Sequence, residues 1–253
     1  MFNSLKRWWQ EQIIRRSPYI EADWQQAFER LPLLERLTDD ERNRLRRLAI
    51  LFLHEKSLEG AGELEVDTQL KLVIALQACL PILNLGLDWY DGWVSVVIHP
   101  YGFTPVHTEM DEYGVVHQVK NDLSGESWLR GPVVLSADAS LEGGIIDGHN
   151  LVIHEFAHKL DMQNGAANGM PPLHSDMSAP QWSEAFSAAY ADLQRRIEHG
   201  KPTPIDHYAA TAPAEFFAVL SEVFFEQPQV IQQHYPAVYR QLALFYRQDV
   251  LDI

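Results

Sequence analysis

The sequence is short of three features, and each shortage narrows what the protein can be. It has one cysteine, Cys79, so no internal disulfide can form, and a single thiol suits a reducing compartment. Basic side chains are few: 20 stand against 35 acidic ones, and the net charge of −15 argues against a general nucleic-acid-binding surface. No stretch approaches the roughly 20 apolar residues that a membrane-spanning helix needs. We therefore expect a cytoplasmic protein without a membrane span and without direct nucleic-acid binding.

The first residues do not resemble a secretory signal, because no apolar run follows their basic side chains. The tryptophan pair at positions 8 and 9 stands among Lys6, Arg7, Arg15 and Arg16. This pattern favours a short amphipathic helix docked on its own protein, and an anchor at a membrane interface is the alternative.

His154, Glu155 and His158 have the spacing HExxH. On a helix, positions four apart share one face with Cβ atoms roughly 6 Å apart, so both imidazoles can reach one zinc ion. Glu155 points about 100° round the helix, beside the metal, where it can take a proton from a zinc-bound water. The pattern is short enough to occur by chance in other helices, so its context decides the interpretation.

The surrounding residues predict a helix over 151–163 independently of the motif. An apolar arc runs along this segment and consists of Ile153, Phe156, Ala157 and Leu160. Asn150 is suited to the N-cap, and Asn164-Gly165 is suited to a left-handed stop. The apolar arc would anchor the helix, while the two histidines face a cleft.

A third zinc ligand is expected from the apolar helix over 214–225, which Pro213 can begin. Glu215 and Glu222 interrupt this helix, and a buried carboxylate needs a compensating charge such as a metal ion. Two imidazoles and one carboxylate leave the fourth position open for water, which is typical of a catalytic zinc site. We prefer Glu215, in the first turn, and keep Glu222 as the alternative ligand or as a group that hydrogen-bonds a ligand. His174 is a weaker candidate because no spacing argument supports it.

Two further polar residues are candidates for supporting roles. Asp161 lies on the histidine face and could accept the free N–H of a ligand imidazole. Tyr208, seven residues before Glu215, could donate a hydrogen bond to an oxyanion, although His207 is almost equally well placed.

The order of patterns predicts an α+β fold. Residues 1–85 indicate helices, one of them opened by the capping box Thr38-x-x-Glu41, and residues 86–253 contain the motif. Strands are expected at 93–98, 115–119 and 132–136, where β-branched residues gather. We expect a helical N-terminal region over 1–85 and a metallopeptidase domain over 86–253. The alternative is that the two form one compact unit. The strand at 132–136 is predicted to be the edge strand along which an extended peptide substrate aligns.

The segment His154–Asp161, together with Tyr208 and Pro213–Ala218, resembles the Mlc titration factor A family, and the resemblance extends over nearly the whole chain. That family is similar to the catalytic domain of anthrax lethal factor, a gluzincin. HExxH alone would not single the family out, but the combination of segments does.

The resemblance implies a zincin-like fold that binds one Zn²⁺ through His154, His158 and Glu215, with Glu155 as the general base. It favours Tyr208, because the lethal-factor pattern has a tyrosine seven residues before its glutamate ligand. It also implies a cytosolic aminopeptidase that binds the glucose repressor Mlc and thereby regulates the glucose phosphotransferase system.

Two other interpretations stay open. The chain could be a non-catalytic or latent regulatory protein that sequesters a transcription repressor, or its zinc could only stabilise the fold. A Glu155→Gln variant separates the first from a peptidase, because it should abolish hydrolysis of peptide substrates while sparing zinc and partner binding.

Overall fold

The fold is described from a computed structural model, which covers residues 2–101, 106–110, 116–120, 126–127 and 131–251. The α-helices are α1 Phe2–Arg15, α2 Glu21–Glu29, α3 Asp39–Glu55, α4 Thr68–Cys79, α5 Ala137–Glu142, α6 Leu151–Asp161, α7 Ala179–Glu198, α8 Pro213–Glu226, α9 Pro228–His234 and α10 Pro236–Tyr246. The strands are β1 Ser57–Gly60, β2 Ser95–His99, β3 Val106–Met110, β4 Val116–Lys120, β5 Glu126–Ser127 and β6 Val133–Ser136. Helices predominate and the strands are short, so the α+β prediction is confirmed.

One small sheet has the strand order β1-β2-β6-β5, with β1, β2 and β6 parallel and β5 antiparallel to β6. β3 and β4 form a separate antiparallel pair. β6 was expected to be a free edge strand, and this prediction is wrong, because Glu126 and Ser127 of β5 pair with Val134 and Val133. The preceding segment returns antiparallel and occupies the side of β6 that a peptide would need.

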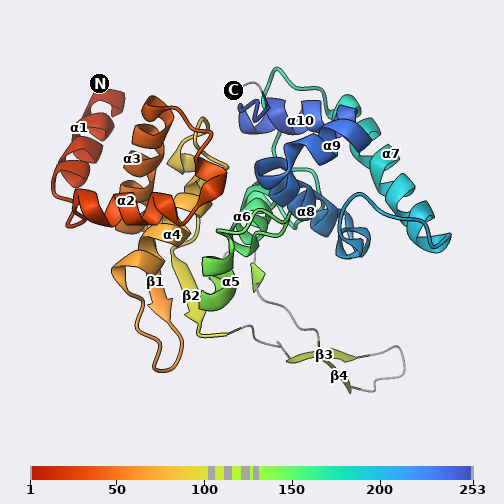
Figure 1. Cartoon of the computed structure of the whole chain (residues 1–253), viewed down its shortest axis with the longest axis horizontal. Helices are drawn as coiled ribbons and strands as arrows, with labels where there is room; N and C mark the ends of the chain where they lie inside the picture. The colour runs from red at the N-terminus through yellow and green to blue at the C-terminus, as the bar shows by residue number, and fades with distance from the viewer. Residues whose placement is uncertain (1, 102–105, 111–115, 121–125, 128–130, 252–253) are drawn as a thin grey trace.

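The molecule has two groups of helices with the motif helix between them (Figure 1). Helices α1 to α4 form one end, α7 to α10 form the other, and α6 lies in the middle against α4 and α8. Helix α4 is buried along most of its length, and Cys79 near its end has no exposed surface. No helix in the described parts of the chain combines the length and the hydrophobicity needed to cross a bilayer.

The helix starts follow from local sequence signals. The Thr38 side chain accepts a hydrogen bond from the N–H of Glu41, whose carboxylate accepts one in return from the Thr38 N–H. Asp67 caps α4 and Asn150 caps α6 in the same way, and Pro213 is the first residue of α8. The expected starts of α3, α6 and α8 are therefore confirmed.

Helix α6 is anchored by the apolar arc that the sequence indicates. The ring of Phe156 lies 5.6 Å from that of Phe52, 5.1 Å from that of Tyr90 and 5.6 Å from that of Trp93. All four rings are buried, and such contacts fix both the depth and the rotation of the helix. The motif side chains on the adjacent stripe are therefore aimed in one direction.

Candidate metal centre

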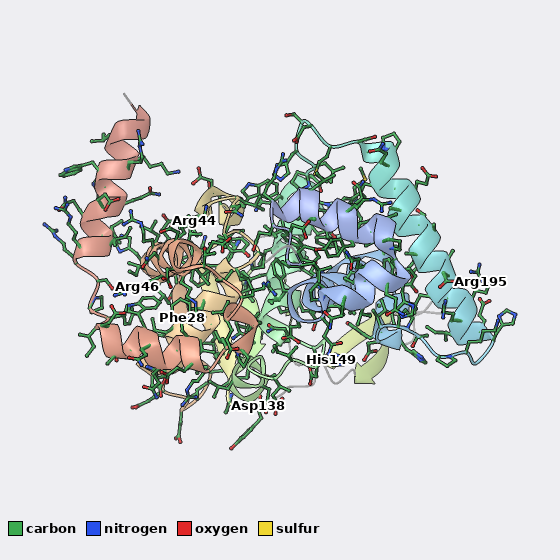
Figure 2. The ribbon with its side chains drawn as sticks, turned by 45° about the horizontal axis from the view of Figure 1, so that its top comes forward. Phe28, Arg44, Arg46, Asp138, His149 and Arg195 are labelled. Carbon is green, nitrogen blue, oxygen red and sulfur yellow. The ribbon has the colours of Figure 1, made fainter. Side chains whose placement is uncertain are left out.

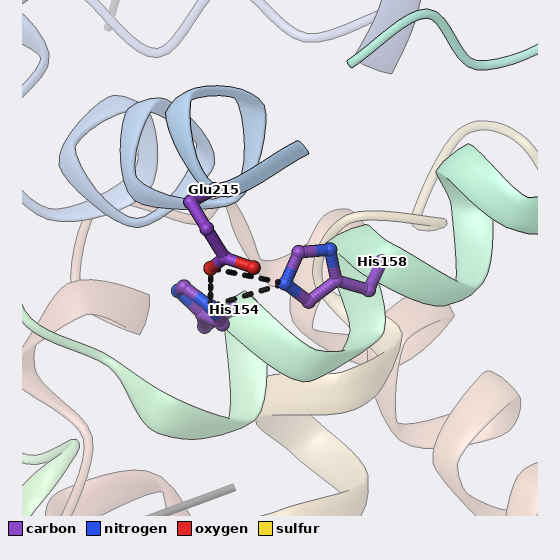
Figure 3. A group of neighbouring side chains, drawn as sticks. All are labelled: His154, His158 and Glu215. Carbon is purple, nitrogen blue, oxygen red and sulfur yellow. Dashed lines mark hydrogen bonds and ion pairs between the residues drawn. The ribbon is translucent and has the colours of Figure 1, made fainter. Parts of the chain in front are cut away.

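Three side chains from two helices converge on one point (Figure 3). His154 and His158 come from α6, and Glu215 comes from the first turn of α8. The Nε2 atoms of the two histidines are 3.2 Å apart, and the Glu215 Oε2 lies 3.0 Å from the His154 Nε2 and 3.4 Å from the His158 Nε2. Among the described residues, this is the one group of histidine, cysteine and carboxylate side chains placed to hold a metal ion.

The spacing of these atoms fits a tetrahedral metal ion. Ligand atoms about 2.0–2.1 Å from such an ion are separated from one another by about 3.3 Å. The three measured separations of 3.0, 3.2 and 3.4 Å lie around that value. The donor set, two imidazole nitrogens and a carboxylate oxygen, is also one that zinc accepts in open sites.

The hydrogen bond at the other nitrogen of His154 supports the same conclusion. Its Nδ1 lies 2.7 Å from the Glu222 Oε1, a contact in which Nδ1 is the donor. With Nδ1 protonated, Nε2 either donates a proton to Glu215 or, in the neutral ring, presents its lone pair to a metal ion beside His158 and Glu215. In the neutral form, electron-rich atoms converge on this point, and a metal ion there would compensate their charge.

The pKa values at the site reflect the same need for positive charge. Burial lowers the pKa of His154, but the nearby carboxylates of Glu222 and Glu215 outweigh it and raise that pKa well above its ordinary value. Burial raises the pKa of Glu215, yet hydrogen bonds from His154 and His158 hold it well below its ordinary range. Glu215 therefore remains an anion at neutral pH.

A model of one peptidase family matches residues 5–247. The chain belongs to the glucose-regulated metallo-peptidase M90 family. It is 42% identical over 224 residues to Mlc titration factor A of Salmonella agona (strain SL483), covering 87% of this chain and 83% of that protein. It is 40% identical over 247 residues to Mlc titration factor A of Salmonella arizonae, covering 96% of each chain. Mlc titration factor A of Escherichia coli (strain 55989 / EAEC) is 40% identical over 230 residues, 90% of this chain and 86% of that one.

In this M90 protein, Glu222 sits behind the metal centre. One carboxylate oxygen contacts the His154 Nδ1, and the other accepts the backbone N–H of Asn150 at 2.5 Å. Asn150 also caps α6 through its own side chain, at 3.0 Å from the Ile153 nitrogen. Glu222 therefore fixes the orientation of the His154 ring and joins α8 to the start of α6, while Glu215 is the carboxylate beside both histidines.

Two members of this network were missed by the sequence reasoning. The Asn150 Nδ2 donates to the Glu226 Oε1 at 3.0 Å and to the Gln77 Oε1 at 2.9 Å, and the Gly148 N–H donates to the Glu226 Oε2 at 2.9 Å. Burial raises the pKa of Glu226 to about 7. The spacing of Glu226, four residues after Glu222, is a signal that could have found it, since it shares a helix face with that carboxylate. Gln77 gives no comparable signal.

Glu155 lies on the same helix as the two histidines and is almost fully buried. Burial raises its pKa to about 7, and within the described part of the chain its Oε2 has no hydrogen-bond partner. A general base works best when its pKa lies near the working pH. The environment of Glu155 therefore suits a group that takes up and releases a proton.

Tyr208 lies on a 3-10 turn, His207–Ala210, immediately before α8. Its ring centroid is 6.1 Å from that of His154, and 40% of its surface is exposed. Burial and the Glu215 carboxylate raise the pKa of its hydroxyl, so this group keeps its proton and can donate it in a hydrogen bond. His207 and Tyr208 are both exposed, but the ring contact with His154 identifies Tyr208 as the residue of the pair that approaches the site.

The expected contact of Asp161 with an imidazole is wrong. Its Oδ2 instead accepts the backbone N–H groups of Asn168 and Gly169 at 2.8 and 2.7 Å. Among the side chains that the structure describes, neither the Asp161 Oδ1 nor the His158 Nδ1 has a partner. Backbone donors of the following loop outcompete the imidazole because they lie close in sequence and are otherwise unpaired.

That loop, residues 165–178, positions the start of α8. Gly169 has φ of 78°, and a Cβ atom there would lie 2.5 Å from the carbonyl oxygen of Pro213. The Trp182 side chain donates to the Gly169 carbonyl at 3.1 Å, which fixes the loop from the other side. The close approach holds the turn that carries Glu215.

His174, the weaker candidate for the third ligand, lies elsewhere. Its Nε2 is 2.8 Å from the backbone oxygen of Phe245, and its ring is 5.3 Å from that of Trp89. These contacts hold it between η2, Leu87–Tyr90, and α10. It therefore takes no part in the cluster of His154, His158 and Glu215.

Proposed function

We propose that this M90 protein is a zinc-dependent peptidase of the aminopeptidase type with a zincin-like, gluzincin fold. His154, His158 and Glu215 would hold one zinc ion, and the observation that carries the proposal is the convergence of their Nε2 and Oε2 atoms within 4.8 Å. Glu155 would be the general base and Tyr208 the hydrogen-bond donor to the oxyanion. Membership of a metallo-peptidase family supports the assignment of a peptidase.

The chemistry divides among these side chains. Zinc, when bound, would supply a Lewis acid that lowers the pKa of water towards about 7. The Glu155 carboxylate takes one proton from a water molecule as the water oxygen bonds to the peptide carbonyl carbon. Tyr208 donates a hydrogen bond to the carbonyl oxygen while negative charge develops there. Glu155 then gives its proton to the nitrogen as the carbon–nitrogen bond breaks, and a free amine and a carboxylic acid leave.

The test is metal content by elemental analysis together with hydrolysis of a panel of amino-acid anilides, on the wild type and Glu215→Ala. We expect about one zinc per chain in the wild type, lost with activity in the variant, because removing one of three protein ligands leaves two. Glu198→Ala, which removes an exposed carboxylate on α7, is the matched control and should retain both.

Each other outcome excludes a part of the proposal. A zinc-free, active wild type would rule out a zinc peptidase. Zinc retained in Glu215→Ala would move the third ligand to another residue, with Glu222 the first to test. Zinc present in a wild type that hydrolyses no anilide would favour a metal that only stabilises the fold, or a latent regulatory protein.

We also propose that the chain acts in the cytoplasm and binds the transcription repressor Mlc, since relatives at about 40% identity are named Mlc titration factor A. Partner binding and hydrolysis are separable by Glu155→Gln, which keeps the shape of the side chain but cannot take a proton. We expect this variant to lose hydrolysis and to retain zinc and repressor in a pull-down. Loss of repressor binding in the same variant would mean that the partner needs the catalytic site.

A further inference from the structure

Helix α1 has a large apolar face that the rest of the molecule leaves uncovered. Leu5, Trp8 and Trp9 expose 63%, 57% and 56% of their surfaces, although all three are side chains that folding normally buries. Ile14 on the opposite side, and Ile13 four residues after Trp9, pack against the core. The exposed residues are spaced by three and four, so they lie on one side of the helix.

The charge of this segment is opposite to that of the protein. Residues 2–16 carry Lys6, Arg7, Arg15 and Arg16 against Glu11, a net charge of +3, whereas the whole chain carries −15. These four basic side chains are all exposed. A basic, aromatic helix on a strongly acidic protein is complementary to an anionic surface and leaves the acidic remainder pointing away from it.

The helix is held in place by its other side. Glu11 pairs with Arg47 of α3, and Lys6 pairs with Asp88 at 2.5 Å. Arg46, also on α3, pairs with Glu21 of α2 and lies near the end of α1 (Figure 2). α1 is therefore fixed to α3, where the Trp9 ring lies 6.1 Å from that of His54 and both tryptophans line a groove with Ile50 and Leu53. More than half of each tryptophan's surface remains exposed. The helix lies at one end of the molecule, away from α6 and α8 (Figure 1).

We propose that the outer face of α1 binds the surface of a membrane containing anionic phospholipids. Tryptophan favours the boundary between headgroups and acyl chains, where its ring is apolar and its N–H remains hydrated. Arginine and lysine beside it are attracted by the negative surface potential of such a membrane. A helix lying in the interface plane needs this combination of apolar face and basic flanks. The binding is peripheral, and it does not depend on the proposed peptidase function.

The experiment is co-flotation of the full-length protein with equimolar phosphatidylglycerol–phosphatidylcholine vesicles, compared with pure phosphatidylcholine vesicles. We expect binding to the anionic vesicles that weakens as salt is raised, since the attraction is screened over a Debye length of about 10 Å at 0.1 M salt. Equal binding to both vesicles, or no flotation with either, would overturn the proposal.

Two variants test the basic and the apolar side chains of this surface separately. Arg15→Glu/Arg16→Glu should reduce partition into anionic vesicles by about 25-fold or more, because each basic side chain contributes about a fivefold factor. Trp8→Ala/Trp9→Ala should reduce it at every salt concentration, because apolar burial is not screened. The control, Lys201→Glu/Arg240→Glu, makes the same change of charge on exposed residues far from α1 and should bind as the wild type does.

Thermal unfolding and zinc content, both expected to be unchanged, verify that each variant is folded. Because flotation is the readout, this test can fail while the metal-site test succeeds, and the reverse also holds. Duplex DNA, which is negatively charged like the anionic vesicles, is added as a competitor. If DNA displaced the protein from vesicles as well as anionic lipid does, the surface would bind polyanions generally and the membrane proposal would be overturned.

Discussion

Helices α6 and α8 supply the two halves of the candidate metal centre and are held in place by different forces. α6 is fixed by apolar packing, above all by Phe156 among three other buried rings. α8 also packs its apolar side chains, but its carboxylates are fixed by polar groups: Glu222 by Asn150, and the turn of Glu215 by the close approach of Gly169. The histidine half of the site is thus positioned by an apolar pattern within one helix, and the carboxylate half by groups distant in sequence.

The largest effect should follow from removing the anchor of α6. Phe156→Ala is expected to lower the free energy of unfolding by about 3–5 kcal/mol, because it leaves a cavity in a closely packed aromatic cluster. Denaturant unfolding measures this, and zinc binding should fall with it. Phe28→Ala, at a partly buried ring on α2, should cost less. Wild-type stability in Phe156→Ala would contradict the view that packing fixes α6.

On the polar side, Glu222→Gln tests whether the carboxylate behind His154 supports the metal. We expect zinc affinity to fall by about 10–100-fold, the usual cost of losing such a partner, with little change in thermal stability. Competition with a fluorescent chelator measures the affinity. Glu198→Gln, exposed on α7, is the control. Unchanged affinity would mean that the His154 ring is held by packing alone, and the contrast between the helices would disappear.

The loop that positions Glu215 can be tested at Gly169. Gly169→Ala should lower stability by about 2 kcal/mol, since it combines a left-handed backbone with a contact too close to the Pro213 carbonyl. Gly200→Ala is a matched control, because its φ of 61° is similar and nothing lies within 4 Å of its added Cβ. Both variants place alanine in a left-handed backbone, but only Gly169→Ala contacts the Pro213 carbonyl. The difference in zinc affinity between them therefore measures how far this contact displaces α8. Equal affinities would show that α8 does not depend on this contact.

The most gradual effect concerns pH, because it develops over several pH units. Burial raises the pKa of Glu226 from 4.5 to about 7, so the folded state binds a proton more tightly than the unfolded state. Its contribution to stability is complete below pH 4.5 and is lost as pH rises through about 7. The wild type should therefore lose stability relative to Glu226→Gln across this window, by on the order of 1 kcal/mol per pH unit. Chemical denaturation of both proteins at several pH values measures this, and parallel pH profiles would show that Glu226 is not proton-linked.

The difference between α6 and α8 also explains what could be predicted from the sequence. The arc through Phe156 and the cap at Asn150 are local patterns, so the start and core face of α6 were correct. Glu215 was preferred because it opens a helix next to irregular chain, and the structure brings it to the two histidines. The helical spacing of apolar residues and the residues at the helix starts were sufficient to predict these positions.

The incorrect predictions share a physical cause. Several groups compete for the same hydrogen-bonding partner, and spacing in the sequence does not show which of them will bind. Asp161 was assigned to an imidazole, but the N–H groups of residues 168 and 169 take its Oδ2. The strand at 132–136 was assigned to an edge, but β5 pairs with it from a segment with little strand signal. β1 was missed because it is short and ends in Gly60, and its identity depends on pairing with β2.

Cys79 is the only thiol in the chain, and it is fully buried in α4 against the core. Burial raises its pKa well above the ordinary value, so the folded protein offers neither access nor thiolate to an alkylating reagent. Modification of the native protein must therefore wait for α4 to open. The rate of that modification, followed by mass spectrometry without any engineered label, measures how often the interior of this molecule is exposed under native conditions.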